Sequence, residues 1–318
     1  MSRQKSTIVR TDQGGGVAAT TPPVAQPGPA LLRATFRTLE RVAPSAGGAL
    51  AERLWFRLPS VPTRQRRMRF VPDGGTAVTV TWNGGRLSGM TYGAADRPTA
   101  YLVHGWGGWW QQLAAHVQPL LDAGYRVVAY DAPSHGDSGP GRYGPRATTI
   151  PEMGEAMAAV VRQHGPAHLV VAHSIGAVAS LWAVDGAGGG ARGYAFLAPA
   201  HSAWHLVAWF QDVLDIGPRT TRALVARVER RVGERFSAFD TVALGSRLTR
   251  GQSPPALLSV HDPDDDETPA SGSRQLTEIW PGAELALVHD LGHRRLLWDP
   301  SVVQHVAAFA ARIKREGS

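Results

Sequence analysis

The sequence predicts an α/β fold in which a mostly parallel, doubly wound sheet is covered by helices on both faces. The first observation behind this prediction is that short apolar or β-branched runs alternate with helical stretches from residue 100 onward. Strands separated by crossover helices form parallel sheets that are buried on both faces. The runs are Ala100–Val103, Arg126–Tyr130, His168–Val171, Gly193–Leu197, Ala256–Val260 and Glu284–Val288.

The second observation concerns the segment before residue 100, where short runs are separated by glycine-rich turns such as Asn83–Gly85. Tight turns of this kind connect antiparallel strands. The runs Met68–Val71, Ala77–Trp82 and Leu87–Tyr92 therefore predict an antiparallel meander at the start of the sheet.

The composition is that of a packed globular protein. The chain has 318 residues, of which 43% are hydrophobic and 19% charged, which fits one large domain or two small ones. It contains no cysteine, so disulfides, thiolate catalysis and cysteine-ligated metal centres are excluded. The sequence has no run of about 18 apolar residues and no apolar block of a secretory signal near its start. We therefore expect a cytoplasmic protein.

The positive charge is concentrated at the N-terminal end. Residues 1–70 contain 12 Lys and Arg side chains against three acidic ones, whereas the remaining 248 residues carry 21 basic and 23 acidic side chains. The net charge of +7 therefore comes from the first 70 residues, and the rest of the chain is close to neutral. Because the excess charge lies outside the predicted α/β body, we expect no nucleic-acid partner.

We divide the chain into three parts. Residues 1–29 are rich in glycine and proline and predict a disordered tail. Residues 30–70 form a basic amphipathic extension, in which helical spacing predicts two helices broken near Pro44–Gly48. We expect this extension to pack on the body with its arginines solvated, and the alternative is a weak contact with an anionic membrane surface. Residues 71–318 form the α/β domain, and the oligomeric state is left open.

An insertion interrupts the predicted sheet at about residues 199–255, where no strand pattern is found. Helical spacing covers Trp204–Leu214, Arg219–Val232 and Phe239–Leu248, and we predict that these helices form a lid. Aromatic and histidine residues near the lid would line an apolar acyl pocket, with ordinary packing as the alternative. These candidate pocket residues are Trp109, Trp110, His201 and Trp204.

A serine lies at a predicted strand-to-helix turn. The strand ending at His173 continues through Ser174 into an apolar helical run, and the residues two before and two after the serine are Ala172 and Gly176. Small residues are needed there because the backbone of such a turn is strained. The segment resembles the nucleophile elbow, G-x-S-x-G, of α/β-hydrolases, with Ala172 in place of the first glycine. The resemblance implies an α/β-hydrolase fold with Ser174 as its nucleophile.

Two further segments resemble loops of the same family. The run Tyr101–Gly108 contains a His-Gly turn at the end of a strand, and the resemblance implies that the backbone N–H groups of Trp106 and Ile175 form an oxyanion hole. The run Asp131–Ser138 resembles the D-x-P-G-H-G-x-S loop, with Ser134 in place of a glycine. We interpret that loop as structural.

The acid and the base follow the serine in the order that this fold requires. The run His261–Pro269 resembles the acid loop H-G-x-x-D-x-x-V-P, which aligns Asp265 with the acid and Asp262 with the glycine. The neighbouring Asp262, Asp264 and Asp266 are the alternative acids. The loop lacks the spacing of a calcium-binding EF-hand, so we expect no metal. Near the end of the chain, Gly292-His293 resembles the segment that carries the catalytic base.

The resemblance therefore implies a serine hydrolase with the triad Ser174, Asp265 and His293. We expect hydrolysis of a carboxylic ester with a small or medium hydrophobic acyl group, through an acyl-enzyme and without a cofactor. Thioesterase, C–C bond hydrolase and acyltransferase activities use the same triad and remain alternatives. A more remote alternative is that the protein is a noncatalytic or membrane-surface-binding member of the fold. A serine nucleophile disfavours the dehalogenase and epoxide hydrolase chemistry that this fold performs with an aspartate.

Overall fold

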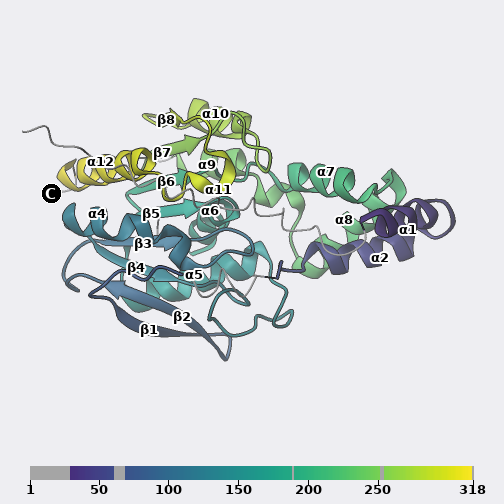
Figure 1. The fold of residues 1–318 in the computed structure, drawn as a ribbon, viewed down its shortest axis with the longest axis horizontal. Coiled ribbons are helices and arrows are strands. Elements are labelled where there is room, and N and C mark those ends of the chain that lie inside the picture. The colour runs from purple at the N-terminus through teal and green to yellow at the C-terminus, as the bar shows by residue number, and fades with distance from the viewer. Residues whose placement is uncertain (1–28, 61–68, 188–189, 251–253, 317–318) are drawn as a thin grey trace, which may run out of the picture.

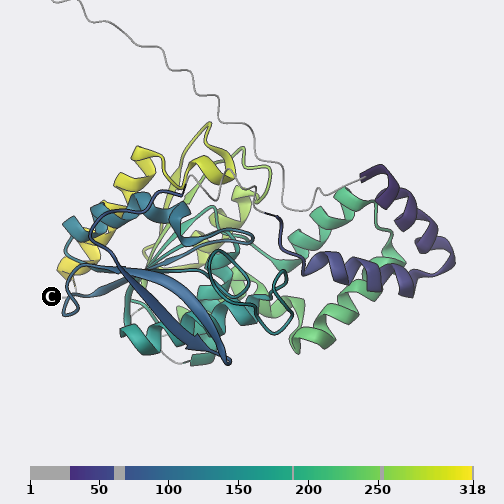
Figure 2. The same cartoon turned by 60° about the horizontal axis from the view of Figure 1, so that its bottom comes forward.

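The computed structural model describes residues 29–60, 69–187, 190–250 and 254–316. The predicted disordered tail lies outside these residues, apart from Pro29, where the first helix begins. Within the described residues, no helix has the length and apolar character needed to cross a bilayer. The described chain forms an α/β body with a group of helices at one end (Figures 1 and 2).

The body is built on one sheet of eight strands in the order β1-β2-β4-β3-β5-β6-β7-β8. The pairs β1/β2 and β2/β4 are antiparallel, and all later pairs are parallel, which confirms the predicted fold class. The strands are β1 (Thr76–Trp82), β2 (Gly85–Tyr92), β3 (Thr99–Val103), β4 (Arg126–Tyr130), β5 (Ala167–His173), β6 (Gly193–Leu197), β7 (Ala256–His261) and β8 (Glu284–Leu287).

The antiparallel start of the sheet is shorter than the sequence predicts. Residues 69–71 are not in a strand, and Met68 lies outside the described residues. Phe70 is 66% exposed, so the apolar run that suggested a strand is not buried against the sheet. The hairpin that remains, β1–β2, is closed by Asn83 and Gly84, which both adopt positive φ angles of 48° and 72°. This is the geometry of a type I′ turn, which suits the twist of paired strands.

Helices cover both faces of the sheet. One face is packed against α5 (Ile150–His164), α6 (Ile175–Ala187), α9 (Thr241–Leu248) and α10 (Ala270–Ile279). The other face is packed against the 3₁₀ helix η1 (Trp110–His116), α4 (Val117–Asp122) and α12 (Pro300–Glu316). Three central strands, β3, β5 and β6, are buried almost throughout, as expected of a parallel sheet between two helical layers. The remaining short helices are η2 (Phe236–Phe239) and α11 (Gly292–Arg295).

Four helices form a cap that projects from the body (Figures 1 and 2). Two come from the start of the chain, α1 (Pro29–Val42) and α2 (Pro44–Trp55), and two from the insertion after β6, α7 (Ala203–Leu214) and α8 (Pro218–Val232). The break between α1 and α2 lies at Ala43, and Gly47 and Gly48 are inside α2. A Cβ on Gly48 would lie 2.5 Å from Cβ of Ala223, so these glycines let α2 approach α8 closely.

Charged side chains of the first two helices hold the cap together. The Glu40 carboxylate accepts hydrogen bonds from the backbone N–H groups of Arg219 and Thr220 at 2.9 and 2.8 Å, and so caps the start of α8. The Glu52 carboxylate is buried and bonds Arg227 and Arg231 of α8 at 2.6 and 2.5 Å. The basic extension therefore packs mainly on the inserted helices.

The chain leaves α2 and runs back to the body. The N–H of Leu58 donates to the carbonyl of Arg146 at 2.8 Å, and Arg57 and Ala147 form an antiparallel bridge. Just before them, the rings of Phe56 and Tyr143 stack with centroids 5.8 Å apart. The segment 56–60 is thus attached to the loop that precedes α5.

Candidate active site

The turn between β5 and α6 holds Ser174 in a left-handed backbone conformation. Its φ angle is +52°, a conformation that residues other than glycine seldom adopt. A Cβ on Gly176 would lie 2.6 Å from the carbonyl oxygen of His104, so only glycine fits two residues after the serine. Ala172 is fully buried in β5, where its methyl group fits. Because α6 begins at Ile175, the N–H of this residue has no partner within the helix.

Asp265 and His293 are joined by a direct hydrogen bond. His293 Nδ1 donates to Asp265 Oδ2 at 2.8 Å, and the side chain of Asp265 is fully buried. The other carboxylate oxygen, Oδ1, accepts the backbone N–H groups of Glu267 and Thr268 at 2.8 and 2.9 Å. Both carboxylate oxygens of Asp265 are therefore held in place, and one of them orients the imidazole ring of His293.

The surroundings of Asp265 keep its carboxylate ionised. Burial raises its pKa, but hydrogen bonds from His261 and His293 and the charge of His293 outweigh burial. The pKa of Asp265 consequently lies well below its ordinary value. The structure thus places an ionised carboxylate directly behind the imidazole ring of His293.

Thr268 and His261 complete a buried polar network around the acid. The hydroxyl of Thr268 donates to Asp265 Oδ2 at 3.0 Å and lies 3.1 Å from His293 Nδ1. His261 Nε2 donates to the carbonyl of Thr268 at 2.9 Å, and its Nδ1 lies 2.7 Å from the hydroxyl of Ser273. Sequence reasoning did not identify Thr268 or Ser273, because their contacts with His293 and His261 join positions that are 25 and 12 residues apart in the chain.

His173, the residue before Ser174, contacts the loop that carries His293. Its Nε2 donates to the carbonyl oxygen of His293 at 3.0 Å, and the two imidazole rings lie 4.6 Å apart. Burial lowers the pKa of His173 well below its ordinary value, and the neighbouring His293 lowers it further. A neutral His173 thus fastens His293 beside the turn that carries Ser174.

The loop after β3 packs directly on the serine. A Cβ on Gly105 would lie 3.0 Å from Cβ of Ser174. The next glycine, Gly107, donates its N–H to His135 Nε2 at 3.0 Å, and His104 Nε2 accepts the N–H of Ala132 at the same distance. Burial lowers the pKa of His135 to about 3, so its ring is neutral and can accept. Two neutral histidines therefore shape the loop that contains Trp106.

Asp131 organises the neighbouring loop. Its carboxylate is fully buried and accepts the backbone N–H groups of Trp110 and Asp137, each at 2.8 Å. Gly136 is required beside it, because a Cβ there would lie 2.0 Å from Asp131 Oδ2. The structure thus gives this loop a structural role, with its carboxylate directed at backbone groups.

A comparison with protein families agrees with this geometry. Residues 100–313 match the model of the alpha/beta hydrolase family, which is more than half of the chain. The chain belongs to the α/β hydrolase family. The match runs from β3, before the loop that contains Gly105 and Gly107, to α12, after His293, and so includes every segment described above.

Solved α/β hydrolase structures have the same fold at low sequence identity. An esterase from Rhodococcus sp. is 17% identical, with a TM-score of 0.54 over 76% of this chain and 99% of that one. A thioesterase domain from the curacin biosynthetic pathway is 14% identical, with a TM-score of 0.54 over 75% and 99%. A haloalkane dehalogenase variant from Bradyrhizobium elkanii is 12% identical, with a TM-score of 0.57 over 77% and 99%. Because their activities differ, these likenesses show the fold alone.

A curated relative matches one part of this α/β hydrolase. The dihydrolipoyllysine-residue acetyltransferase component of the acetoin cleaving system of Cupriavidus necator is 41% identical over 90 residues. The match spans 27% of this chain and 23% of the relative.

The four candidate pocket residues contact different neighbours. Trp110 is in the core, 4% exposed, with its ring packed against Tyr92, so this position is one of packing. The ring of Trp109 lies under the guanidinium group of Arg69, 5.0 Å from it. His201 packs on α10 and accepts the N–H of Thr241 at 3.0 Å through its carbonyl.

Trp204 belongs to an aromatic cluster of the cap. It lies in the first turn of α7, is 50% exposed and is 5.3 Å from the ring of Phe236. Trp55 of α2 contacts the same phenyl ring and also that of Phe210, at 5.8 and 5.3 Å. Next to Trp204 in α7, His205 hydrogen-bonds the backbone of Glu267 in the acid loop. No local sequence pattern indicates this cluster, because its members come from segments far apart in the chain.

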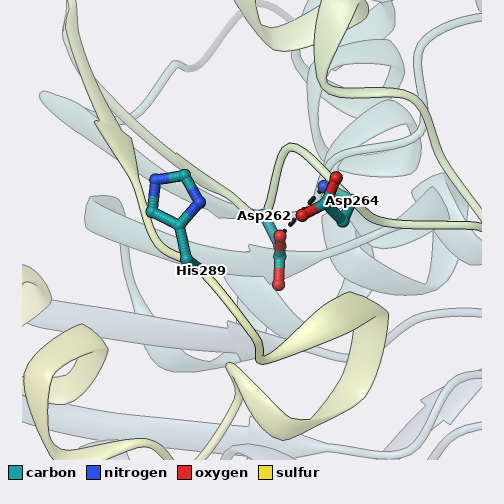
Figure 3. A group of neighbouring side chains, drawn as sticks. All are labelled: Asp262, Asp264 and His289. Atoms are coloured by element: carbon teal, nitrogen blue, oxygen red, sulfur yellow. Dashed lines mark hydrogen bonds between the residues drawn. The ribbon is translucent and has the colours of Figure 1, made fainter.

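The remaining aspartates of the loop do not contact the side chain of His293. Asp264 and Asp266 are exposed, and Asp262 is buried against backbone N–H groups. The ligand atoms of Asp262, Asp264 and His289 lie within 4.8 Å of one another (Figure 3). The dashed line in Figure 3 is the hydrogen bond from the Asp264 N–H to Asp262, whose carboxylate is already engaged. We assign no metal ion to this group.

Proposed function

We propose that the protein is a serine hydrolase that cleaves a carboxylic ester with a small or medium hydrophobic acyl group. Ser174 is the nucleophile, His293 the base and Asp265 the acid. The observation that carries the proposal is the 2.8 Å hydrogen bond from His293 Nδ1 to a buried, ionised Asp265, beside a serine held at a φ angle of +52°. An oriented base next to a serine on a strained turn is the arrangement that activates a hydroxyl nucleophile.

In the first step, Ser174 Oγ attacks the ester carbonyl carbon. Because Asp265 engages His293 Nδ1, Nε2 is the ring nitrogen that takes the hydroxyl proton. The carbonyl π electrons move to oxygen, and the backbone N–H groups of Trp106 and Ile175 hold that oxyanion. The negative charge of Asp265 stabilises the imidazolium formed in this step.

Collapse of the oxyanion breaks the bond between the carbonyl carbon and the alcohol oxygen. The alcohol leaves with the proton from His293 Nε2, and the acyl group stays on Ser174 Oγ. Water then attacks the acyl carbon, gives its proton to His293, and the acid is released while Ser174 regains its hydroxyl proton. Transfer of the acyl group to an acceptor in place of water would make the protein an acyltransferase. A thiol leaving group would make it a thioesterase, and a carbon leaving group a C–C bond hydrolase.

Two measurements test this proposal. Wild-type protein should react with a fluorophosphonate probe and hydrolyse p-nitrophenyl esters of some acyl length, and Ser174→Ala should do neither. If the wild type neither reacts with the probe nor turns over any ester of the series, the proposal is wrong. The acyl length with the highest kcat/KM would define the substrate class.

The identity of the acid is tested separately. Asp265→Asn should lower kcat by on the order of 10³–10⁴-fold, because an amide cannot stabilise the imidazolium or fix the tautomer of His293. Asp266→Asn is the matched control, since this neighbouring carboxylate is exposed. Equal losses in the two variants would contradict the assignment of Asp265.

A further inference from the structure

A second carboxylate in the acid loop is directed at the loop that carries His293. Asp262 follows the last residue of β7 and is 1% exposed. Its Oδ1 accepts the N–H of Asp264 at 2.9 Å, and its Oδ2 accepts the N–H groups of Leu291 and Gly292 at 2.7 and 2.6 Å. The carboxylate is therefore shared between two loops that are about thirty residues apart in the sequence.

The segment that Asp262 holds is conformationally demanding. Asp290 and Gly292, on either side of Leu291, have φ angles of +63° and +60°. Two left-handed residues so close together turn the chain tightly at the start of α11. They leave backbone N–H groups that need a buried acceptor. His293 is the next residue, so the direction of its Cα–Cβ bond is set by this turn.

We propose that Asp262 is a positioning residue for His293, which it serves by fixing the backbone of Leu291 and Gly292. The inference rests on the proposed function, in which His293 is the base. Asp262 acts through the backbone, whereas Asp265 acts on the imidazole ring itself. The two carboxylates, three residues apart on one loop, thus set the position and the orientation of the same side chain.

The electrostatics of Asp262 suit this role. Burial raises its pKa, but the backbone N–H groups of Gly292, Asp264 and Leu291 outweigh burial and lower the pKa below its ordinary value. Hydrogen bonds to an ionised acceptor are shorter and stronger than neutral ones, in agreement with the distances of 2.6 and 2.7 Å. In the acid-loop pattern that this sequence resembles, glycine aligns with Asp262, and glycine has no side chain that could accept these hydrogen bonds.

Two other contacts hold the loop around His293. Arg294 bonds Glu267 of the acid loop through two nitrogens at 3.0 and 3.2 Å, but this pair is partly exposed. His173 bonds the carbonyl of His293. Asp262 is buried and charged, and it bonds the residues that precede His293. Its loss should therefore affect this turn more than loss of the partly exposed pair of Arg294 and Glu267.

The test compares Asp262→Ala and Asp262→Asn with the matched control Asp264→Asn, which changes an exposed carboxylate two residues away. A misplaced base costs rate with little effect on binding, so Asp262→Ala should lower kcat by about 10²-fold with KM within about twofold. Asp262→Asn should lower kcat by only about tenfold, because its amide oxygen can still accept hydrogen bonds from the N–H groups of Leu291 and Gly292. Asp264→Asn should behave as wild type.

A second readout does not depend on ester hydrolysis. Amide hydrogen exchange at Leu291 and Gly292 should be about 10²-fold faster in Asp262→Ala than in wild type, and unchanged in Asp264→Asn. If the wild type cleaves no ester, the proposed function fails. The exchange measurement still tests whether Asp262 fixes the backbone of Leu291 and Gly292. Unchanged exchange in Asp262→Ala, or unchanged kcat in a folded variant, overturns the inference. Should Asp262→Ala not fold, Asp262→Asn supplies both readouts.

A cation at the group in Figure 3 would give a different pattern. In that case Asp264→Asn and His289→Ala would lower kcat as much as Asp262→Ala does, and a chelator would lower the activity of the wild type. That outcome overturns the positioning role of Asp262, because accepting backbone hydrogen bonds requires neither the Asp264 nor the His289 side chain.

Discussion

Pro59 packs directly on Gly107. A Cβ on Gly107 would lie 2.3 Å from Cγ of Pro59, and the φ angle of this glycine is +67°. Gly107 follows Trp106, whose backbone N–H we assign to the oxyanion hole. The segment that returns from the N-terminal helices therefore supports the loop on which the proposed chemistry depends.

Substitution of Gly107 should impair catalysis. Gly107→Ala must displace either Pro59 or the oxyanion loop, and we expect kcat to fall at least about tenfold in the ester assay. Gly84→Ala is the matched control, because Gly84 also has a positive φ angle, +72°, but nothing within 4 Å of its would-be Cβ. Both variants should lose about 1 kcal/mol of stability from backbone strain.

A double variant separates the contact from the strain. Pro59→Ala removes the ring atoms that lie nearest, and its Cβ would be 3.8 Å away. Pro59→Ala combined with Gly107→Ala should therefore recover much of the lost kcat. If the double variant is as slow as Gly107→Ala, the contact with Pro59 is not the cause.

Removal of the Thr268 hydroxyl should slow the reaction. This hydroxyl lies 3.0 Å from Asp265 Oδ2 and 3.1 Å from His293 Nδ1, so it supports the bond between them. Thr268→Val should lower kcat by about tenfold, in keeping with the loss of one hydrogen bond to a charged group. Thr268→Ser keeps the hydroxyl and should retain most of the activity, and equal losses in both variants would argue against a role for the hydroxyl.

The buried Glu52 should stabilise the cap. Its side chain is 5% exposed and bonds two arginines that are 38% and 44% exposed. Glu52→Ala leaves both arginines without this partner, and we expect a loss of about 2 kcal/mol in urea unfolding, after allowance for solvent around the arginines. Arg37→Ala is the control, because the pair of Arg37 and Asp215 is about half exposed and should contribute about 0.5 kcal/mol or less.

Buried histidines should make the protein sensitive to mild acid. Burial lowers the pKa of His116 to about 4 and that of His135 to about 3, against an unfolded value of 6.5. The unfolded chain therefore binds more protons below pH 6.5, so stability is full above that pH and falls as the pH decreases. Each histidine contributes a slope of about 1.4 kcal/mol per pH unit in this range.

His116→Gln tests this expectation, because glutamine keeps a donor for the carbonyl of Leu297 that His116 Nε2 bonds at 3.0 Å. The free energy of unfolding of His116→Gln should depend less steeply on pH between about pH 6.5 and about pH 4. The reduction in slope corresponds to one proton fewer taken up on unfolding. Identical slopes for wild type and variant would contradict a neutral His116 in the folded state.

Local patterns explain how much of the site was accessible from the sequence. The elbow could be predicted because the serine, the small residues and the flanking strand and helix lie within a few positions of one another. Motif spacing selected Asp265 from the four aspartates of this loop, and in the structure Asp265 hydrogen-bonds His293. Their catalytic roles stay predictions. Thr268 contacts the His293 side chain, and Asp262 contacts the backbone of the two residues before it, from a different loop. No local pattern reports such contacts.

The cap could be predicted only in part. Helical periodicity located its helices, but it does not say which helices pack together. Gly47 and Gly48 suggested a break, whereas the structure uses them for close approach between α2 and α8. Trp110 resembled a pocket residue because it adjoins the oxyanion loop in sequence, yet its side chain points into the core. Contact of residues 30–70 with an anionic membrane remains a prediction.

The construction of the cap also bears on how the chain is made. Arg33 in α1 donates to the carbonyl of Val213 in α7, a residue 180 positions later. At a synthesis rate of ~5–20 residues per second, the second partner follows the first by roughly 10–40 s. During that interval α1, whose Phe36 is fully buried in the folded protein, lacks its packing partners α7 and α8. The N-terminal helices can therefore complete their native packing only after the inserted helices have been synthesised.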